Sequence, residues 1–317
     1  MLLLSGTELS VIAALWLLLD VAFLVSLFLH VLGDCTRRGS STLCAVFQDL
    51  IRYGKTKVGQ GRPAWLRCFD LPKRWFSHFY YLSLLWNGAL LWVIVQSQLF
   101  GIEKPQWLQS LLNFFHKEPI QKISGGEFST LLALSLIWLH SLRRLAECLY
   151  VSIYSKGVIH LAQYCLGIGY YFLIGITLLN HAKLEPKQVT VSDLASQVHW
   201  YHIIGMILYI WASVHQHRCH VILANLRKNK SGKVVTMNHV VPTGDWFERV
   251  SCPHYFAELL IYISIALLFG LSHTSWWLVV MFVLFNQSLA AILCHEFYHE
   301  KFDNYPAQRK AFIPYVF

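Results

Sequence analysis

Chemistry in this 317-residue chain is concentrated first in a polar stretch between two apolar runs, from Asn225 to Glu258. The stretch begins with Arg227, Lys228 and two further lysines, and it contains Pro242 and other turn-forming residues. Arginine and lysine bind phosphate through charge-assisted hydrogen bonds, and a carboxylate at the start of an apolar run can hold a polar group of a ligand. The stretch therefore predicts a site for a phosphorylated ligand at a membrane surface.

A second polar group follows the apolar run 128–142. His140 and Arg144 are four residues apart, as are Arg143 and Glu147, so each pair shares one helix face. Arginines at the end of a membrane helix often serve as anchors whose side chains reach the headgroups, and we interpret Arg143 in this way. Arg144 fits an anchor and a phosphate ligand equally well. His140 lies deeper in the run and suits a polar group beside a reaction.

The apolar run 78–101 begins with His78, Tyr80 and Tyr81. Polar and ionisable side chains are costly in hydrocarbon unless they face a cavity or a partner. Tyr81 fits the belt of aromatic residues found at membrane interfaces. His78 and Tyr80 are therefore candidates for groups that face a reacting substrate.

The C-terminal residues 295–317 alternate aromatic with basic side chains and end in an apolar segment. A purely solvated tail would be polar throughout, so we expect this one to pack back onto the rest of the chain. Arg309 would reach a phosphate, and Tyr298 and Tyr305 would offer hydroxyl groups or ring faces to a nucleotide.

Three neighbouring histidines, His215, His217 and His220, raise the alternative of a metal site such as the di-iron centre of membrane desaturases. Such a centre needs several histidine clusters with supporting carboxylates, whereas the other histidines are scattered, so we expect no metal. The glycine-rich motifs of Walker and Rossmann sites are also absent from the sequence. A nucleotide would then be held by separate Arg, Lys, Tyr and His side chains at helix ends.

Membrane helices must position these residues. The chain is 56% hydrophobic and 14% charged, with a mean hydropathy of +0.46, whereas soluble domains are roughly 25% charged. We interpret the formal charge of +9 as a signal of membrane orientation and expect membrane lipids, not nucleic acid, as partners. Seven apolar runs approach the roughly 20 residues needed to cross a bilayer: 8–33, 78–101, 128–142, 157–180, 200–223, 256–271 and 274–295.

Basic residues set the orientation of these runs. The odd-numbered loops and the C-terminal tail have nine, three, five and three Lys and Arg residues in turn, whereas the even-numbered loops 102–127 and 181–199 have three and two. By the positive-inside rule, the N-terminus is lumenal and the C-terminus cytosolic. We therefore predict an all-α polytopic membrane protein with about seven spans, forming a single domain over 1–317. Segments 44–52 and 105–115 have the helical apolar spacing of interfacial helices.

The eight cysteines form no CxxC pair and mostly fall on the predicted cytosolic side or inside the spans. Thiols stay reduced in those places, so we expect neither a disulfide framework nor a structural zinc site.

Four ordered segments together resemble the steroid 5α-reductase family. They are HSLRRLAECLYVS (140–152), NLRKNKSG (225–232), VPTGDWFERVSCPHYFAE (241–258) and FYHEKFDNYPAQRKAFIPYVF (297–317). Two more segments, FQDLIRYGKTK and PKRWFSHFYYLSLLWNG, are similar to the branch of the family that reduces polyprenols. The similarity covers nearly the whole chain apart from its N-terminal segment and the lumenal loops.

The resemblance implies an NADPH-dependent enzyme of the endoplasmic reticulum membrane, with a seven-helix bundle and a catalytic region over about 126–317. The polyprenol-reducing branch saturates the α-isoprene unit of a long-chain polyprenoid to give dolichol, the carrier lipid for protein N-glycosylation. Matching motifs imply cofactor-binding roles for Arg144, Arg227, Lys228, Glu258 and Tyr298. His254, His295 and Arg309 are further candidates for binding the cofactor.

The chain departs from the steroid-reducing relatives where they hold the steroid ketone. Ser77-His78 replaces a Gln–Glu pair, and Ser141 stands where those relatives have a tyrosine. We therefore expect a polyprenoid substrate and keep reduction of a 3-oxo-Δ4-steroid as the alternative function. His254 replaces an asparagine that lies near the nicotinamide in the relatives.

Hydride can add to a carbon–carbon double bond only if the charge that develops on the neighbouring carbon is stabilised. A conjugated carbonyl does this and an allylic alcohol does not, so we predict that the reacting form is polyprenal, with His78, Tyr80 or His140 polarising the carbonyl. A membrane methyltransferase that uses S-adenosylmethionine and a lipid transporter are competing readings. A transporter is expected to show internal repeats, and the sequence has none.

Overall fold

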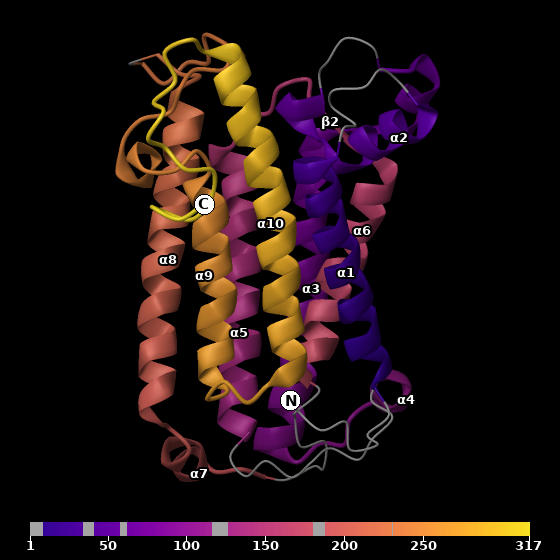
Figure 1. Cartoon of the computed structure of the whole chain (residues 1–317). Helices are drawn as coiled ribbons and strands as arrows, with labels where there is room; N and C mark the ends of the chain where they lie inside the picture. The colour runs from indigo at the N-terminus through magenta and orange to yellow at the C-terminus, as the bar shows by residue number, and fades with distance from the viewer. Residues whose placement is uncertain (1–8, 34–40, 58–61, 116–125, 180–187, 230) are drawn as a thin grey trace.

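The computed structural model describes residues 9–33, 41–57, 62–115, 126–179, 188–229 and 231–317. These residues form a mostly helical, elongated bundle whose long helices run side by side (Figure 1). The long helices are α1 (Val11–Leu32), α3 (Phe76–Phe100), α5 (Gly126–Ala146), α6 (Leu161–Leu178), α8 (Trp200–Asn225), α9 (Pro253–Leu268) and α10 (Thr274–Lys301).

A helix occupies each of the seven predicted apolar runs. Four of them, α1, α3, α6 and α10, are long and apolar enough to cross a membrane. Helix α9 is shorter, with 16 residues, and α5 and α8 carry many of the polar side chains discussed below. The prediction of a mostly helical membrane protein is confirmed.

Short elements connect the long helices. The segments predicted as interfacial helices are indeed helical, as α2 and α4. The ends of the bundle differ: α2 and β2 lie at one end, and α4 and α7 lie at the other (Figure 1). The short elements are α2 (Thr42–Ile51), η2 (Gly54–Lys57), η3 (Ala64–Phe69), β1 (Asp70–Pro72), η4 (Lys73–Trp75), α4 (Gln106–Phe115), η5 (Glu147–Val151), β2 (Val158–His160), α7 (Val191–Ser196) and η7 (Asp245–Glu248).

Close helix contacts depend on small residues. Helix α8 packs along α9, α3 along α5 and α6, and α1 along α10. A Cβ atom added at Gly205 of α8 would lie 3.0 Å from the backbone oxygen of Ser264 in α9. A Cβ at Gly175 of α6 would lie 2.4 Å from the Asn87 side chain of α3. Small residues let membrane helices approach closely enough for dispersion contacts, so these glycines set the helix spacing.

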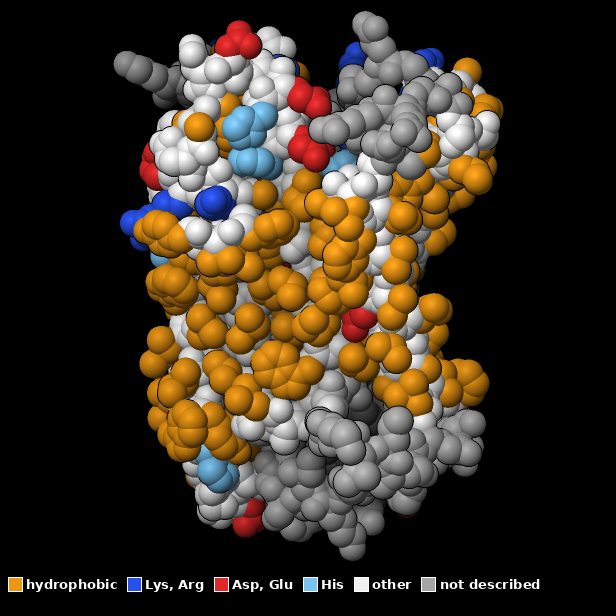
Figure 2. Space-filling model, viewed as in Figure 1, with side chains coloured by type: hydrophobic (Ala, Val, Ile, Leu, Met, Phe, Trp, Pro, Cys, Tyr) orange, Lys and Arg blue, Asp and Glu red, His pale blue; other side chains and the backbone are white. Residues whose placement is uncertain are grey.

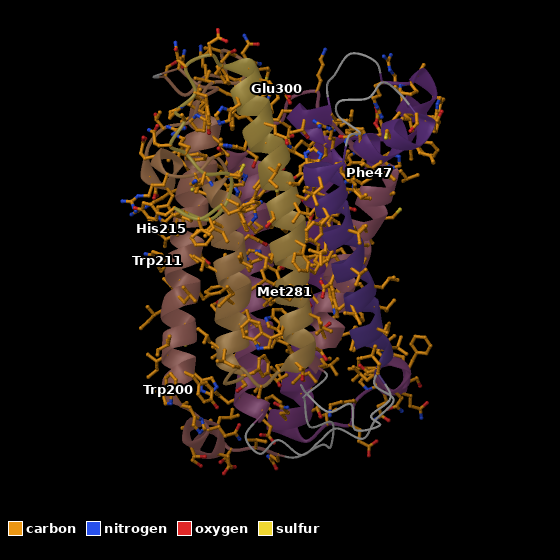
Figure 3. The ribbon with its side chains drawn as sticks, in the orientation of Figure 1. Phe47, Trp200, Trp211, His215, Met281 and Glu300 are labelled. Atoms are coloured by element: carbon orange, nitrogen blue, oxygen red, sulfur yellow. The ribbon has the colours of Figure 1, made fainter. Side chains whose placement is uncertain are left out.

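Apolar side chains cover the sides of the bundle between its two ends (Figure 2). Trp200, Trp211 and Met281 are examples on the outer face (Figure 3), with 70%, 47% and 36% of their surface exposed. An apolar surface this extensive is unstable in water and is typical of a protein that contacts lipid. The surface therefore agrees with the composition.

A buried ion network joins the segment before α3 to α2. Lys57 Nζ lies 3.1 Å from Asp49 Oδ2 and 3.4 Å from Asp70 Oδ1, and Arg62 donates to both aspartates. Burial would raise the pKa of Asp70, but the hydrogen bonds from Arg62 and the charge of Lys57 outweigh it and lower that pKa. Asp70 also pairs with His160 across the antiparallel strands β1 and β2. The network fixes the turn η2 on the end of the bundle.

The C-terminal residues fold back onto the bundle, as predicted. The backbone N–H of Lys310 donates to Arg249 (2.9 Å), and the N–H of Ser251 donates to the carbonyl of Lys310 (2.8 Å). Phe312 is fully buried behind this contact. The tail is therefore part of the folded domain.

The expectation of reduced cysteines is wrong at one position. Cys44 is disulfide-bonded, whereas the six other cysteines in the described ranges are free thiols. Cys44, in the first turn of α2, was assigned a reducing environment from charge alone, and charge patterning carries no information on the pairing of two particular thiols.

Candidate functional site

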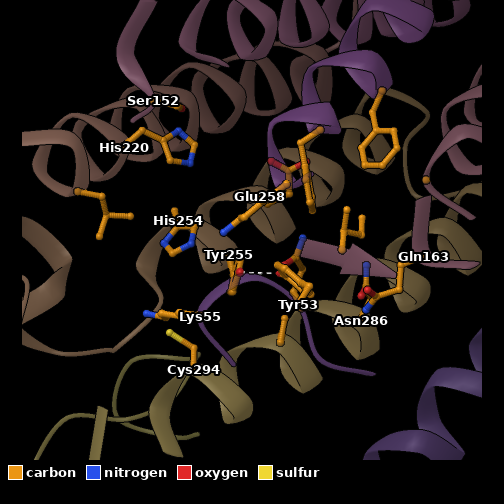
Figure 4. Close-up of a pocket in the computed structure, with 18 of the residues that line it drawn as sticks. Tyr53, Lys55, Ser152, Gln163, His220, His254, Tyr255, Glu258, Asn286 and Cys294 are labelled. Atoms are coloured by element: carbon orange, nitrogen blue, oxygen red, sulfur yellow. Dashed lines mark hydrogen bonds between the residues drawn. The ribbon is translucent and has the colours of Figure 1, made fainter. Parts of the chain in front are cut away.

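A cavity of about 600 Å³ lies inside the bundle, toward the end that carries α2 and β2. Its walls come from the ends of α3, α5, α6, α8 and α9 that meet there, from α10 and from the η2 turn. Figure 4 shows Tyr53, Lys55, His254, Tyr255 and Glu258 around it. The hydroxyl groups of Tyr53 and Tyr255 are 2.7 Å apart and join the η2 side of the cavity to α9.

One end of the cavity is cationic and is lined by Lys55, Lys73 and Arg227. Lys55 Nζ lies 3.8 Å from the centre of the Tyr298 ring, and none of the three cations forms an ion pair with a carboxylate in the described ranges. Burial, together with the charges of Lys55, Lys301 and Arg227, lowers the pKa of the neighbouring His239 to about 4. Cations without carboxylate partners are suited to an anionic ligand.

Beside this end, the carboxylate of Glu147 contacts two arginines of α5 and two histidines of α8. Arg143 Nη1 lies 2.7 Å from Glu147 Oε1, Arg144 donates to Oε2, and His217 and His220 approach within 2.9 and 2.8 Å. Burial would raise the pKa of Glu147, but the hydrogen bond with His220 and the charges of the arginines lower it. The ionised carboxylate thus holds the guanidinium of Arg144 at the cavity wall.

A second carboxylate, Glu258, lies in the cavity wall at the start of α9. It accepts a hydrogen bond from Gln216, whose carbonyl oxygen accepts one from Arg143 (2.5 Å). On its other side, Glu258 Oε1 lies 3.3 Å from His140 Nε2. His254, one turn earlier, has a buried Nδ1 with no hydrogen-bond partner among the described residues. Glu258 is therefore oriented by its neighbours, whereas His254 Nδ1 is left for a ligand.

The phenol of Tyr80 reaches the cavity from α3. Its oxygen accepts hydrogen bonds from Arg144 Nη2 (3.1 Å) and Nε (3.3 Å), so its own O–H is left to donate. The Tyr171 ring lies 5.4 Å from that of Tyr80, and Tyr170 continues the row toward Phe282 of α10. The guanidinium of Arg144 thus holds the phenol oxygen at the cavity wall, and the O–H remains available as a hydrogen-bond donor.

The other end of the cavity is largely apolar, between α1, α6 and α10. Phe23, Leu166, Tyr170 and Phe282 line it. Such walls exclude water and bind hydrocarbon. The cavity therefore has a charged region suited to a polar, anionic ligand and an apolar region suited to hydrocarbon.

The structure brings together six of the predicted site residues around the cavity and leaves five outside its lining. The six that line it are Tyr80, Arg144, Arg227, His254, Glu258 and Tyr298. The five outside are His78, His140, Lys228, His295 and Arg309.

Two of the three candidate catalytic residues face other side chains. His78 Nδ1 lies 3.0 Å from the Tyr164 hydroxyl, and its ring packs on Trp75. His140 is buried behind Glu258. Helical spacing predicted that these residues are polar groups in an apolar run, but it did not predict which face of each helix borders the cavity.

The cofactor-binding candidates outside the cavity lining contact other parts of the protein. Arg309 Nη1 donates to the carbonyl of Pro242 (2.8 Å), which fastens the tail to the loop after α8. His295 lies 2.6 Å from Ser251 Oγ, which also contacts Tyr305. The Tyr305 ring stacks on Tyr298, with centres 5.3 Å apart. Lys228 begins a turn in which it pairs with Val234 through the backbone.

Several cavity residues were not singled out from the sequence. Lys55, Lys73 and Tyr53 lie in the two segments that resemble the polyprenol-reducing branch, so a signal was present. Their charge was counted only toward membrane orientation. Asn286 of α10 carried no sequence signal beyond being polar in an apolar run. No group of three or more His, Cys, Asp or Glu side chains in the described ranges could hold a metal ion.

The chain is similar to known proteins over nearly all of its length. Residues 158–317 match the family model described as 3-oxo-5-alpha-steroid 4-dehydrogenase. The chain is 62% identical to the polyprenal reductase of Xenopus tropicalis over 308 residues, which cover 97% of this chain and 100% of that protein. Identity to the polyprenal reductase of Homo sapiens is 52% over 316 residues (98% and 97%), and to that of Danio rerio 44% over 308 residues (97% and 98%).

Proposed function

Because the chain belongs to the 3-oxo-5-alpha-steroid 4-dehydrogenase family, we propose that it reduces the α-isoprene double bond of a polyprenal with NADPH. The family and the curated relatives make it an oxidoreductase that acts on a carbon–carbon double bond. One cavity with a cationic end and an apolar end is the observation that carries the proposal. The phosphate groups of a nucleotide match the cationic end, and the hydrocarbon of an isoprenoid matches the apolar end.

The aldehyde is the chemically competent form of the lipid. Bound NADPH would supply a hydride, and the β carbon of a conjugated carbonyl would accept it, because the resulting charge is delocalised onto the carbonyl oxygen. The α carbon then takes up a proton. The saturated product is dolichal, which would feed dolichol synthesis and protein N-glycosylation.

The residues at the cationic end fit NADPH. Lys55, Lys73 and Arg227 would bind its phosphate groups, because they lie together without protein carboxylates. The buried Nδ1 of His254 would bind a polar group of the cofactor, and the Tyr298 ring is available for stacking. Among the described residues, no carboxylate pairs with these three cations, which favours NADPH, with its extra phosphate, over NADH.

Among the three catalytic candidates, Tyr80 is best placed to act on the carbonyl. Its O–H would donate to the aldehyde oxygen while Arg144 stabilises the phenol oxygen. Glu258, held by Gln216 and by His140 behind it, would orient a polar group at the reacting end of the cofactor. The apolar walls around the double bond exclude water, which strengthens these electrostatic contacts.

The seven long helices would all cross the bilayer, with the N-terminus lumenal and the cavity near the cytosolic face. The alternation of basic and non-basic loops supports this arrangement. A cytosolic cavity has access to NADPH, and the polyprenoid would enter from within the membrane. We place the protein in the endoplasmic reticulum, where dolichol-linked glycosylation takes place.

Purified protein supplied with NADPH and either polyprenal or polyprenol tests the proposal. We expect saturation of the α-isoprene unit of the aldehyde and much slower turnover of the alcohol. Equal or faster turnover of the alcohol would contradict the enal mechanism. A 3-oxo-Δ4-steroid serves as a third substrate, since the family description names this chemistry. Preferential reduction of the steroid would favour that alternative.

A further inference from the structure

Two adjacent amides of α10, Asn286 and Gln287, line the cavity but have no role in the reaction described above. Asn286 lies in the cavity close to Gln163 of α6 (Figure 4). Both amides belong to a 28-residue helix that is apolar enough to cross a membrane, and Asn286 is one turn beyond Phe282. Polar side chains at such positions require a physical reason.

Neither amide forms a hydrogen bond with a described residue. Gln216, another amide at the cavity wall, has both ends paired, with Arg143 and with Glu258. An unpaired amide in apolar surroundings destabilises the protein, and polar groups within membrane helices commonly mark ligand contacts. Asn286 and Gln287 are thus placed to bind a ligand rather than to hold the helices together.

The neighbours of these amides indicate the chemical class of the ligand. Phe23, Leu166 and Phe282 make this part of the cavity suitable for hydrocarbon. A polyprenoid is hydrocarbon throughout except for its terminal oxygen, and a side-chain amide can donate to an aldehyde and can also accept from an alcohol. A carbonyl oxygen has two lone pairs, so it can accept from an amide and from Tyr80 together.

We propose that the Asn286–Gln287 pair supplies a side-chain amide that binds the terminal oxygen of the polyprenoid and so selects its α-isoprene unit for reduction. The other isoprene units present the same trisubstituted double bond, and only the oxygen distinguishes the first unit. Hydrogen bonds to that oxygen bring the α-isoprene unit to the reacting position. The identity of the lipid rests on the proposed function.

Binding of farnesol and of farnesene tests the proposal, because the two share an isoprenoid skeleton and differ in the terminal oxygen. Displacement of a fluorescent isoprenoid from purified protein gives both affinities without turnover. We expect the unmodified protein to bind farnesol about tenfold more tightly than farnesene. In the double variant Asn286→Leu/Gln287→Leu, farnesol should lose this advantage while farnesene still binds.

Ser288→Ala is the matched control, since Ser288 is buried on the same helix outside the cavity lining. It should keep the farnesol preference. If the double variant does not fold, the single variants Asn286→Leu and Gln287→Met replace it, and at least one should reduce the preference. An unmodified protein without a preference, or variants that keep it in full, would overturn the proposal. Stabilisation by NADPH is measured separately, so failure of the reductase function is distinguishable.

Discussion

Arg144 shows how contacts decide between two roles that spacing leaves open. The residue stands at the end of an apolar run, where arginines often anchor to headgroups. Its side chain is only 14% exposed and contacts Tyr80, Glu147 and His220 at the cavity wall. A headgroup anchor would be exposed to the interface. The structure therefore favours a role in the site.

Tyr80→Phe removes the O–H that would donate to the substrate carbonyl while keeping the ring. We expect kcat to fall by roughly 10²- to 10⁴-fold, with little change in the stabilisation of the protein by NADPH. Steady-state rates with a polyprenal and thermal shifts with NADPH measure the two effects. Tyr81→Phe is the control, because Tyr81 is exposed and outside the cavity lining. Equal losses in both variants would remove Tyr80 from the mechanism.

Lys55→Met removes one cation from the phosphate-binding end. We expect the KM for NADPH to rise about tenfold or more and the smaller activity with NADH to change less. Rates at varied concentrations of each nucleotide measure the difference. Lys233→Met changes an exposed lysine of the basic loop and should leave both values unchanged. A similar loss with both nucleotides would mean that Lys55 does not recognise the extra phosphate.

At the scale of elements, the seven apolar runs predicted helices well because length and hydropathy are local properties. The η2 turn was not predicted, since its position depends on distant partners. Gly54 adopts a positive φ of 58° there, and Asp49, Lys57, Arg62 and Asp70 fix the turn. The same limit explains Arg309 and His295, which were predicted as ligand contacts. The sequence shows that both residues are polar, but their contacts with Pro242 and Ser251 follow from tertiary packing.

The ion network around η2 makes stability depend on pH. The pKa of Asp70 is lowered in the folded state, so its contribution is present above the ordinary aspartate pKa and is lost as the pH falls through the folded value. We expect Asp70→Asn to destabilise the protein at neutral pH by about 1–3 kcal/mol and to flatten the loss of stability in acid. Thermal unfolding midpoints between neutral and acidic pH measure both. Asp303→Asn, at an exposed site, should behave like the unmodified protein.

At the scale of the whole molecule, the site combines two regions of the chain. The family model matches residues 158–317, whereas Tyr53, Lys55, Lys73 and Tyr80 lie before it. Sequence motifs located the later half of the site because its segments are distinctive. In the earlier half only Tyr80 was singled out, because the places of Tyr53, Lys55 and Lys73 at the cavity depend on tertiary packing. A fragment limited to the matched region would lack most of the cationic end.

The predicted orientation has a direct test. In sealed microsomes, we expect protease to remove an epitope tag at the C-terminus and to spare a tag at the N-terminus, because the basic loops and tail face the cytosol. Detergent should make both tags accessible, which controls for the protease. Removal of the N-terminal tag from sealed vesicles would contradict an odd number of spans with a lumenal start.

A cavity of about 600 Å³ affects how the reaction rate would depend on the concentration of each substrate. Cavities of this size enclose a molecule of ordinary drug dimensions, so most of a long polyprenoid must stay outside, among the lipid tails. Binding of the nucleotide then depends on its concentration in water, whereas binding of the lipid depends on its concentration per area of membrane. Adding inert phospholipid at constant total substrate would slow the reaction by surface dilution, while added buffer would act only through the nucleotide.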